Sequence, residues 1–407
     1  MTTIINADTS GGLKLTSDTS GSLEIQSAGT TKLTIGSTSV DIPAIAGVTS
    51  INGGQVGGSR NKIINGEMKV AQRSTSETGL GAAAGYFTLD RWKIDTANSA
   101  GRLTMTQTAD GPNGFANCIK LDCTTADTSL AAGEHLIISQ RFEGQDLQSI
   151  GKGAAGAKEV TVSFYVKANA AFTFGLELYD ADNTRQITKL YTTTTDWVRH
   201  KITFPADTTG VFTDDNLESL QLGFWLHAGS TFASGTLNTA AWANNTNANR
   251  AAGIDSFYSS TDNNFFITGI QMEIGSTATD FEHKSFGEDL TLCQRYFQKT
   301  YDYDVAIATN TIIGTHASGG NNVSPTTSYI GINTAKFTSQ MRDNPTLVLY
   351  DTAGNSGKST RFQYGVAETD NQAATVANIG TTGFNGYSAS SANLSGARIH
   401  YTATSEL

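Results

Sequence analysis

Four pairs of acidic residues lie close enough in the sequence to suggest acid–base chemistry on a glycan. Cleavage of a glycosidic bond needs two carboxyl groups about 5 to 10 Å apart, flanking the bond. Successive residues of a strand point to opposite faces, so only a spacing of two can place both acids on one side. Turns and solvated strand edges account better for these pairs, and we predict no catalytic residue. The pairs are Asp180/Asp182, Asp214/Asp215, Glu288/Asp289 and Asp302/Asp304.

Three aromatic residues are candidates for sugar binding. Aromatic rings stack on the C–H faces of sugar rings, while polar neighbours bind the hydroxyl groups. Tyr165, Tyr179 and Trp225 alternate with apolar residues in three predicted strands, so each lies on the non-core side of its strand. If these strands are neighbours, the three side chains line one sheet face. The alternative is that Tyr and Trp simply favour strands.

Two predicted loops add further aromatic candidates. Residues 234–264 hold Trp242 among several asparagines and Arg250, which makes a surface rich in hydrogen-bonding groups. Trp242 is either a glycan contact or a packing anchor of that loop. Phe384 and Tyr387 flank Asn-Gly in a predicted turn of the kind that a receptor-binding tip presents. A plain surface turn is the alternative there.

The sequence shows no motif for a metal or a cofactor. Its six histidines are scattered without the spacing of zinc ligands. A Gly-x-Ser-x-Gly elbow and a phosphate-binding P-loop are also missing. We therefore expect no metal, no cofactor and no enzymatic activity. The histidines are His135, His200, His227, His283, His316 and His400.

Composition and charge narrow the class of protein. The 407 residues include 42 Gly and 5 Pro, and only 16% are charged, which favours a Thr/Ser/Asn-rich β protein over a helical enzyme. A net charge of −10 argues against the basic face that nucleic acid needs. No apolar stretch approaches the ~20 residues that cross a bilayer, and no secretory signal is recognised, so we expect neither membrane insertion nor secretion. The three cysteines are expected to be reduced core residues.

Alternation of apolar and polar residues predicts the strands that position the candidates. The alternation is clean over residues 160–167, 172–179 and 220–227, and it recurs more weakly elsewhere. About ten strands without intervening helices are typical of a sandwich of two antiparallel sheets. The sequence therefore predicts a mainly β protein with a jelly-roll-like β-sandwich over residues 61–284.

The sequence after residue 284 predicts a helix and a smaller β domain. Ser285 and Glu288 form a capping box, which predicts a connecting helix over residues 285–299. Short apolar strands separated by Gly, Asn and Ser turns follow. We interpret residues 300–407 as a distal β domain.

Apolar pairs recur at a ten-residue spacing near the start of the chain. Each pair predicts a short strand with one apolar face, and so little apolar surface cannot stabilise ~40 residues alone. We expect identical copies to pair their open strand edges over residues 1–42. A flexible Thr/Ser/Gly-rich tail is the alternative. Residues 43–60 predict a Gly-rich linker. The residues expected to form the oligomer contacts are Leu13, Leu15, Leu23, Ile25, Leu33 and Ile35.

Several stretches resemble fibre and tail proteins of tailed bacteriophages. Residues 266–275, 278–283 and 292–297 are similar to a segment common in that family. The opening of its jelly-roll-like module is similar to residues 61–68 and 89–92, and its C-terminal domain to residues 341–346 and 401–407. The resemblance covers residues 61–407 in outline and contains no catalytic motif.

The resemblance implies a receptor-binding appendage of a virion. Its N-terminal segment would attach to a tail or capsid protein, and a sandwich similar to carbohydrate-binding modules would contact host surface glycan. We expect a homotrimer that is assembled in the host cytoplasm and carried on the virion, where several weak sites act together. Two alternatives stay open: a capsid or baseplate decoration fibre without a receptor, and a glycan depolymerase.

Overall fold

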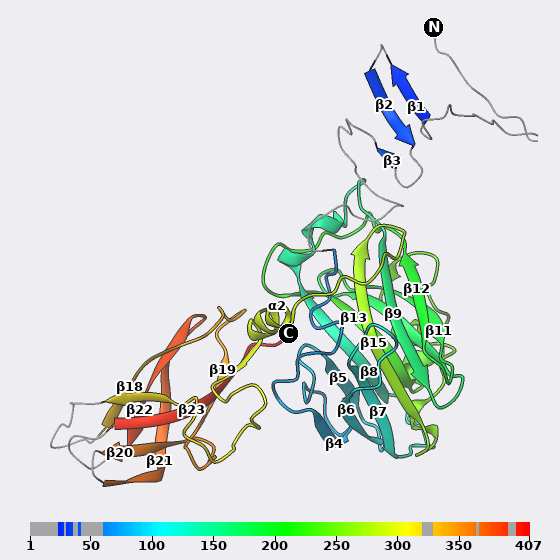
Figure 1. The fold of residues 1–407 in the computed structure, drawn as a ribbon. Coiled ribbons are helices and arrows are strands. Elements are labelled where there is room, and N and C mark those ends of the chain that lie inside the picture. Colours follow the sequence, from blue (N-terminus) through cyan, green and yellow to red (C-terminus); the bar gives the residue numbers. More distant parts are fainter. Residues whose placement is uncertain are drawn as a thin grey trace, which may run out of the picture. The chain divides into compact units, whose positions relative to one another are not determined.

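The computed structural model describes residues 23–27, 30–35, 40–41, 60–319, 329–363, 366–389 and 396–407. The chain divides into two compact units, Met1–Asn52 and Gly53–Leu407. Antiparallel strands dominate the described residues (Figure 1), which confirms the predicted mainly β class. The predictions for Leu13 and Leu15, and for all of the linker except Arg60, lie outside these residues.

The N-terminal unit contains a three-stranded antiparallel sheet. Its strands are β1 (Leu23–Ser27), β2 (Thr30–Ile35) and β3 (Val40–Asp41), paired in this order. Leu23 is the cross-strand partner of Ile35, and Ile25 is the partner of Leu33. The predicted strands are confirmed at these positions, where they pair with one another, and the pairing of their open edges between copies stays a prediction.

The central sandwich consists of two six-stranded sheets. The first sheet contains β5 (Lys93–Ala97), β8 (His135–Glu143), β10 (Thr173–Asp180), β11 (Arg185–Thr192), β13 (Glu218–Ala228) and β14 (Ala243–Asn244). The second contains β4 (Ser76–Leu80), β6 (Arg102–Thr108), β7 (Cys118–Thr125), β9 (Val160–Ala168), β12 (Val198–Phe204) and β15 (Asn264–Ile274). The strand orders are β14-β11-β10-β13-β8-β5 and β12-β9-β15-β7-β6-β4.

The main core lies between these two sheets, because alternate residues of each strand point inward. Leu176 and Leu178 of β10 are buried in this core, as are their cross-strand partners Phe224 and Leu222 of β13. Phe164 of the second sheet meets Phe224 of the first edge-on, with ring centroids 5.1 Å apart. The strands predicted from clean alternation over residues 160–167, 172–179 and 220–227 are thus confirmed as β9, β10 and β13.

A helix follows the sandwich, as the capping box predicted. α2 spans Phe286–Gln294, and Ser285 and Glu288 cap each other's backbone N–H groups at its start. The helix ends five residues short of the predicted boundary at 299, because β16 (Phe297–Lys299) joins the distal sheet instead. No helix among the described residues is long and apolar enough to cross a membrane. The remaining helical turns are α1 (Ser230–Ala233), η1 (Gly144–Asp146), η2 (Gln148–Ile150), η3 (Asn247–Asn249) and η4 (Phe257–Ser259).

The distal domain is one eight-stranded sheet with its own core. Besides β16 it contains β17 (His316–Gly319), β18 (Tyr329–Lys336), β19 (Thr346–Tyr350), β20 (Lys358–Gln363), β21 (Val366–Gly380), β22 (Gly383–Ala389) and β23 (Gly396–Thr404). The order is β16-β23-β20-β21-β22-β18, and β17 and β19 also pair with β23. Ile330, Ile332, Phe384 and Ile399 are among its buried core residues.

Buried ion pairs join the distal domain to the sandwich. Glu406 accepts from Arg73 Nη2 at 3.1 Å and also pairs with Arg91, which is fully buried. The Arg91 guanidinium lies 3.4 Å from the ring centroid of Tyr296. Glu143 of β8 accepts from Arg295 Nε and Nη2 at 2.7 and 2.6 Å. Although burial opposes its ionisation, hydrogen bonds from Arg295 and Tyr296 hold the pKa of Glu143 below its ordinary value.

Candidate functional site

Tyr179 and Trp225 lie on the outer face of the first sheet, and Tyr165 does not. Tyr179 belongs to β10 and Trp225 to the neighbouring β13, where Gly175 is its cross-strand partner. Tyr165 belongs to β9 in the second sheet, so the core separates it from the other two residues. The expectation that three rings line one sheet face is therefore wrong for Tyr165. Its ring packs against Phe115 instead, with centroids 5.2 Å apart.

The segment that follows β13 buries Trp225. The indole of Trp225 is fully buried and packs with Ile137 and Ala251. Phe232 and Ile254 lie against the same cluster. A sugar ring needs an exposed aromatic face. Trp225 is therefore a packing residue in this structure, not a surface on which a glycan can stack.

Arg250 and Glu177 complete the surroundings of Tyr179. Arg250 Nε and Nη2 donate to the two Glu177 carboxylate oxygens at 2.8 and 2.7 Å, and Trp225 Nε1 donates to Oε2 at 2.8 Å. The guanidinium lies 4.8 Å from the Tyr179 ring centroid and 5.0 Å from that of Trp225. Burial opposes its charge, but the adjacent Glu177 carboxylate raises the pKa of Arg250. Arg250 thus covers one face of the half-buried Tyr179 ring.

Polar side chains cross the outer face of the first sheet beside this cluster. Gln186, Tyr179, Gln221 and Arg141 are successive cross-strand neighbours. Within the described part of the chain, Gln221 Nε2, Gln186 Oε1 and the nearby Ser139 Oγ are buried without a hydrogen-bond partner. Such atoms cost free energy unless they are bonded. Because these atoms are shielded from solvent, they are not accessible to a ligand, and the described part of this face offers no freely exposed aromatic ring.

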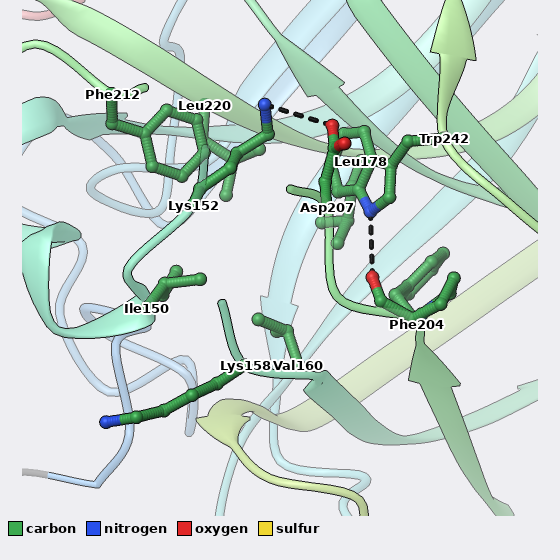
Figure 2. A pocket seen from close by; sticks show the side chains of 11 residues that line it. Ile150, Lys152, Lys158, Val160, Leu178, Phe204, Asp207, Phe212, Leu220 and Trp242 are labelled. Atoms are coloured by element: carbon green, nitrogen blue, oxygen red, sulfur yellow. Dashed lines mark hydrogen bonds and ion pairs between the residues drawn. The ribbon is translucent and has the colours of Figure 1, made fainter. Parts of the chain in front are cut away.

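Trp242 lines a pocket with about 300 Å³ of empty space, part of it open to solvent (Figure 2). Trp242 Nε1 donates to the Pro205 carbonyl at 2.9 Å, and Lys152 Nζ lies 5.4 Å from its ring centroid. Lys152 also pairs with Asp207 at 3.1 Å and with the buried Asp180. These contacts favour the packing-anchor interpretation of Trp242. The rest of the lining is largely apolar: Ile150, Val160, Leu178, Phe204, Phe212 and Leu220.

Asp180 and Asp182 serve the turn between β10 and β11, as the turn interpretation predicted. Asp180 Oδ1 accepts from the Asn183 backbone N–H at 2.9 Å, and its carboxylate also binds Lys152. Asp182 Oδ2 accepts from the Thr213 backbone N–H at 2.9 Å. Both carboxylates thus have structural partners.

In the distal domain, Phe384 and Tyr387 have different surroundings. Both belong to β22, so the predicted turn is a strand. Phe384 is fully buried and meets the Tyr401 ring edge-on at 5.1 Å, which removes it as a receptor contact. Tyr387 points the other way, is 47% exposed, and has a neighbour that sequence analysis missed, Tyr329 of β18. Alternation of Tyr329, Gly331 and Asn333 with Ile330 and Ile332 is the signal that could have revealed this strand.

The fold also brings together three side chains that sequence spacing could not connect. One ligand atom from each of Asp127, Glu134 and His227 lies within 4.8 Å of the others, and all three residues are buried. This is the one group in the described part of the chain that could hold a metal ion. His227 lies 93 positions from Glu134, far beyond the short spacings by which ligand motifs are recognised.

The sequence matches no family model and no curated protein. Similar solved structures include the CBM22-1 xylan-binding domain from Paenibacillus barcinonensis, at 11% identity over 51% of this chain and 98% of that one, with a TM-score of 0.25. The family 11 carbohydrate-binding module of a cellulosomal cellulase of Clostridium thermocellum is 13% identical over 49% and 99%, with a TM-score of 0.25. A family 30 carbohydrate-binding module is 11% identical over 53% and 88%, with a TM-score of 0.27. A likeness of this extent does not establish what the chain binds.

Proposed function

We propose that the chain is a glycan-binding protein without catalytic activity, whose distal domain contacts sugar through Tyr329 and Tyr387. The observation that carries the proposal is that these two neighbouring tyrosines are 56% and 47% exposed, with ring centroids 6.3 Å apart. Exposed apolar surface that is clustered, and not scattered, commonly marks an interaction site. Two free aromatic rings side by side suit the C–H faces of a glycan.

Small residues beside the two rings keep them accessible. Gly331 of β18 and Thr375 of β21 are the cross-strand partners of Tyr387 on either side. A Cβ atom built at Gly331 would meet no atom of the described residues within 4 Å, its own chain neighbours aside, so there is open space beside Tyr387.

Amide groups border the rings on the same strands. Asn333 lies on β18 and Asn385 on β22, two positions from Gly331 and Tyr387 respectively. An amide offers both donors and an acceptor, which matches the hydroxyl groups on the edge of a sugar ring. The tyrosine pair with its amide border is the contact surface we assign to glycan.

We further propose that this glycan lies on a host surface and that the chain is a homotrimeric tail fibre or receptor-binding appendage of a tailed-bacteriophage virion. The support is the resemblance of residues 61–68, 266–275 and 341–346 to that family. Residues 1–42 would attach the chain to a tail or capsid protein and join three copies, assembled in the host cytoplasm. Three weak sites held together bind a surface far more tightly than one.

Glycan arrays probed with the full chain test the proposal. Tyr329→Ala and Tyr387→Ala each remove one ring, and we expect each to weaken binding about tenfold, the equivalent of ~1.4 kcal/mol. The Tyr→Phe variants keep the ring and stay within about threefold of wild type. Val366→Ala truncates another exposed apolar residue of β21 and serves as the matched control, with unchanged binding. Wild-type affinity in the Tyr329→Ala/Tyr387→Ala double variant, or no glycan bound by wild type, contradicts the proposal.

Two further measurements separate the alternatives. Incubation with host capsule or lipopolysaccharide releases no oligosaccharide if the chain only binds, and release identifies a depolymerase. Light scattering of the full chain after gel filtration gives the mass of a trimer if residues 1–42 join three copies. A monomer contradicts the trimeric appendage but leaves glycan binding by a single chain intact. A decoration fibre without a receptor binds neither the arrays nor host cells.

A further inference from the structure

Two carboxylates and one imidazole converge where the β7–β8 connection meets the end of β13. Asp127 lies in that connection, and Glu134 directly precedes β8. His227 lies near the end of β13, where the pairing of β13 with β8 shifts register between Trp225 and His227. Two segments that are distant in the sequence, the β7–β8 connection and β13, therefore contribute the three ligand atoms.

The two carboxylates have no lysine or arginine partner in the described part of the chain. Among the residues that the structure describes, the one ion pair of the group joins His227 Nε2 to Glu134 Oε2 at 3.4 Å. Glu134 is 4% exposed, and no described donor outside the group reaches its carboxylate. Burying a carboxylate without a compensating cation is expensive. A divalent cation held between the carboxylates and the imidazole offsets that cost.

Neighbouring polar groups hold two of the side chains in position. His227 Nδ1 lies 2.8 Å from Ser256 Oγ, and Asp127 Oδ2 accepts from the Ala100 backbone N–H at 2.8 Å and from Ser99 Oγ at 3.2 Å. Partners of this kind orient metal-binding histidines and carboxylates. With the proton on Nδ1 and donated to Ser256, the Nε2 lone pair faces Glu134 Oε2. A cation between these two atoms satisfies both.

We propose that Asp127, Glu134 and His227 bind one divalent transition-metal ion, for which Zn²⁺ is the best match. Zinc takes carboxylate oxygen and imidazole nitrogen at ~2.0 to 2.2 Å, which separates ligand atoms around one ion by roughly 3 to 4.5 Å. The 3.4 Å between His227 Nε2 and Glu134 Oε2 falls within that range, and all three ligand atoms lie within 4.8 Å of one another. Calcium prefers oxygen ligands alone, so the imidazole argues against it. The bound ion would tie the β7–β8 connection to β13 and stabilise the sandwich.

Calorimetric titration of chelator-treated full-length protein with Zn²⁺ tests this site. We expect one Zn²⁺ per chain, a higher unfolding temperature in its presence, and at least tenfold weaker binding of Ca²⁺. Glu134→Gln and His227→Gln each remove one ligand and weaken Zn²⁺ binding at least tenfold. His200→Gln changes a half-buried histidine of β12 outside the group and is the matched control, with wild-type affinity. Visible absorption of bound Co²⁺, present in wild type and lost in His227→Gln, reports coordination directly.

Some outcomes overturn the site. The proposed site is wrong if the wild type does not bind Zn²⁺ stoichiometrically. It is also wrong if both ligand variants bind Zn²⁺ with wild-type affinity. Near-ultraviolet circular dichroism checks that the variants fold. Should they not fold, Ser256→Ala keeps all three ligands but removes the hydrogen bond that orients His227, and an affinity loss of about tenfold supports the site. Unchanged affinity in Ser256→Ala with unfolded ligand variants counts against it. None of these readouts depends on glycan binding.

Discussion

Arg250 binds Glu177 through two parallel hydrogen bonds, from Nε to Oε1 at 2.8 Å and from Nη2 to Oε2 at 2.7 Å. Bidentate pairs of this kind fix the relative orientation of the two side chains. Because Glu177 lies on β10 and Arg250 follows η3, the pair fastens the segment after β13 onto the outer face of the first sheet. The same contact keeps Trp225 covered.

Breaking this pair should destabilise the sandwich. Arg250→Ala leaves the buried Glu177 carboxylate with Trp225 Nε1 as its remaining side-chain donor, and we expect a loss of about 3 to 5 kcal/mol in the free energy of unfolding. Urea unfolding followed by tryptophan fluorescence measures it. The double variant Glu177→Gln/Arg250→Met removes both charges and should lose less than Arg250→Ala alone. If Arg250→Ala lowers the free energy of unfolding by less than about 1 kcal/mol, the pair contributes little to the stability of the sandwich.

Truncation of Phe384 should lower stability, whereas truncation of Tyr387 should lower glycan affinity and leave stability nearly unchanged. Phe384→Ala removes a buried ring from the distal core and should cost about 3 to 5 kcal/mol. Tyr387→Ala alters an exposed side chain and should stay within about 0.5 kcal/mol of wild type, while it weakens glycan binding. Thermal unfolding of the two variants, read beside the glycan arrays, provides the comparison. Equal destabilisation by both variants would contradict the assigned burial.

Trp242 should matter for stability and not for glycan binding. Trp242→Phe keeps an aromatic ring in the pocket wall but loses the hydrogen bond to the Pro205 carbonyl, at a cost of about 1 kcal/mol. Trp242→Ala also loses packing against the main core and should cost about 3 kcal/mol. Urea midpoints and glycan affinities of the two variants are compared with wild type. An affinity loss in a variant of unchanged stability would instead make Trp242 a sugar contact.

Asp90 should make stability fall as pH rises. Burial raises the pKa of Asp90 to about 6, although the adjacent Arg73 opposes this. In the unfolded chain an aspartate titrates near ~3.9, so between about pH 4 and about pH 6 the folded chain binds more protons, and the free energy of unfolding decreases with rising pH. The contribution amounts to roughly 3 kcal/mol across this window.

A variant that cannot titrate isolates this contribution. Asp90→Asn lacks the carboxyl group, so the stability of wild type minus that of the variant should fall between about pH 4 and about pH 7. Subtraction removes the contributions of other groups, some of which change stability with pH in the opposite direction. Glu143 is an example, because its pKa is lowered and the stability that it contributes is lost as pH falls. A difference that is flat or rises with pH would show that Asp90 stays ionised through its pairing with Arg73.

Local patterns in the sequence were enough to predict strands and caps. Period-two alternation marks β9, β10 and β13, and Ser285 with Glu288 marks the start of α2, because these signals arise from adjacent residues. The end of α2 was missed, since β16 is selected by pairing with β23, about a hundred residues away. Sheet membership is likewise non-local, so nothing near Tyr165 shows that β9 and β10 belong to different sheets.

The candidate sites were harder to predict because exposure depends on what covers a face. Trp225 points away from the main core, as alternation requires, yet the segment holding Ala251 buries it. Tyr387 was found by its residue type, whereas its partner Tyr329 lies on a strand brought beside it only by the fold. The group of Asp127, Glu134 and His227 depends on the pairing of β13 with β8, which brings His227 beside Glu134, 93 positions earlier, and for which the sequence carries no clear signal.

Strand β23 hydrogen-bonds to β16, β17, β19 and β20, all of which precede it in the chain. During synthesis these four strands leave the ribosome before Gly396–Thr404 does, and until then each lacks that neighbour. The distal sheet can therefore close only after translation has passed residue 404, and unpaired edges are open to intermolecular contact in the interval. Production of this chain in good yield should depend on slow synthesis, low temperature or chaperone supply more than on the stability of the finished fold.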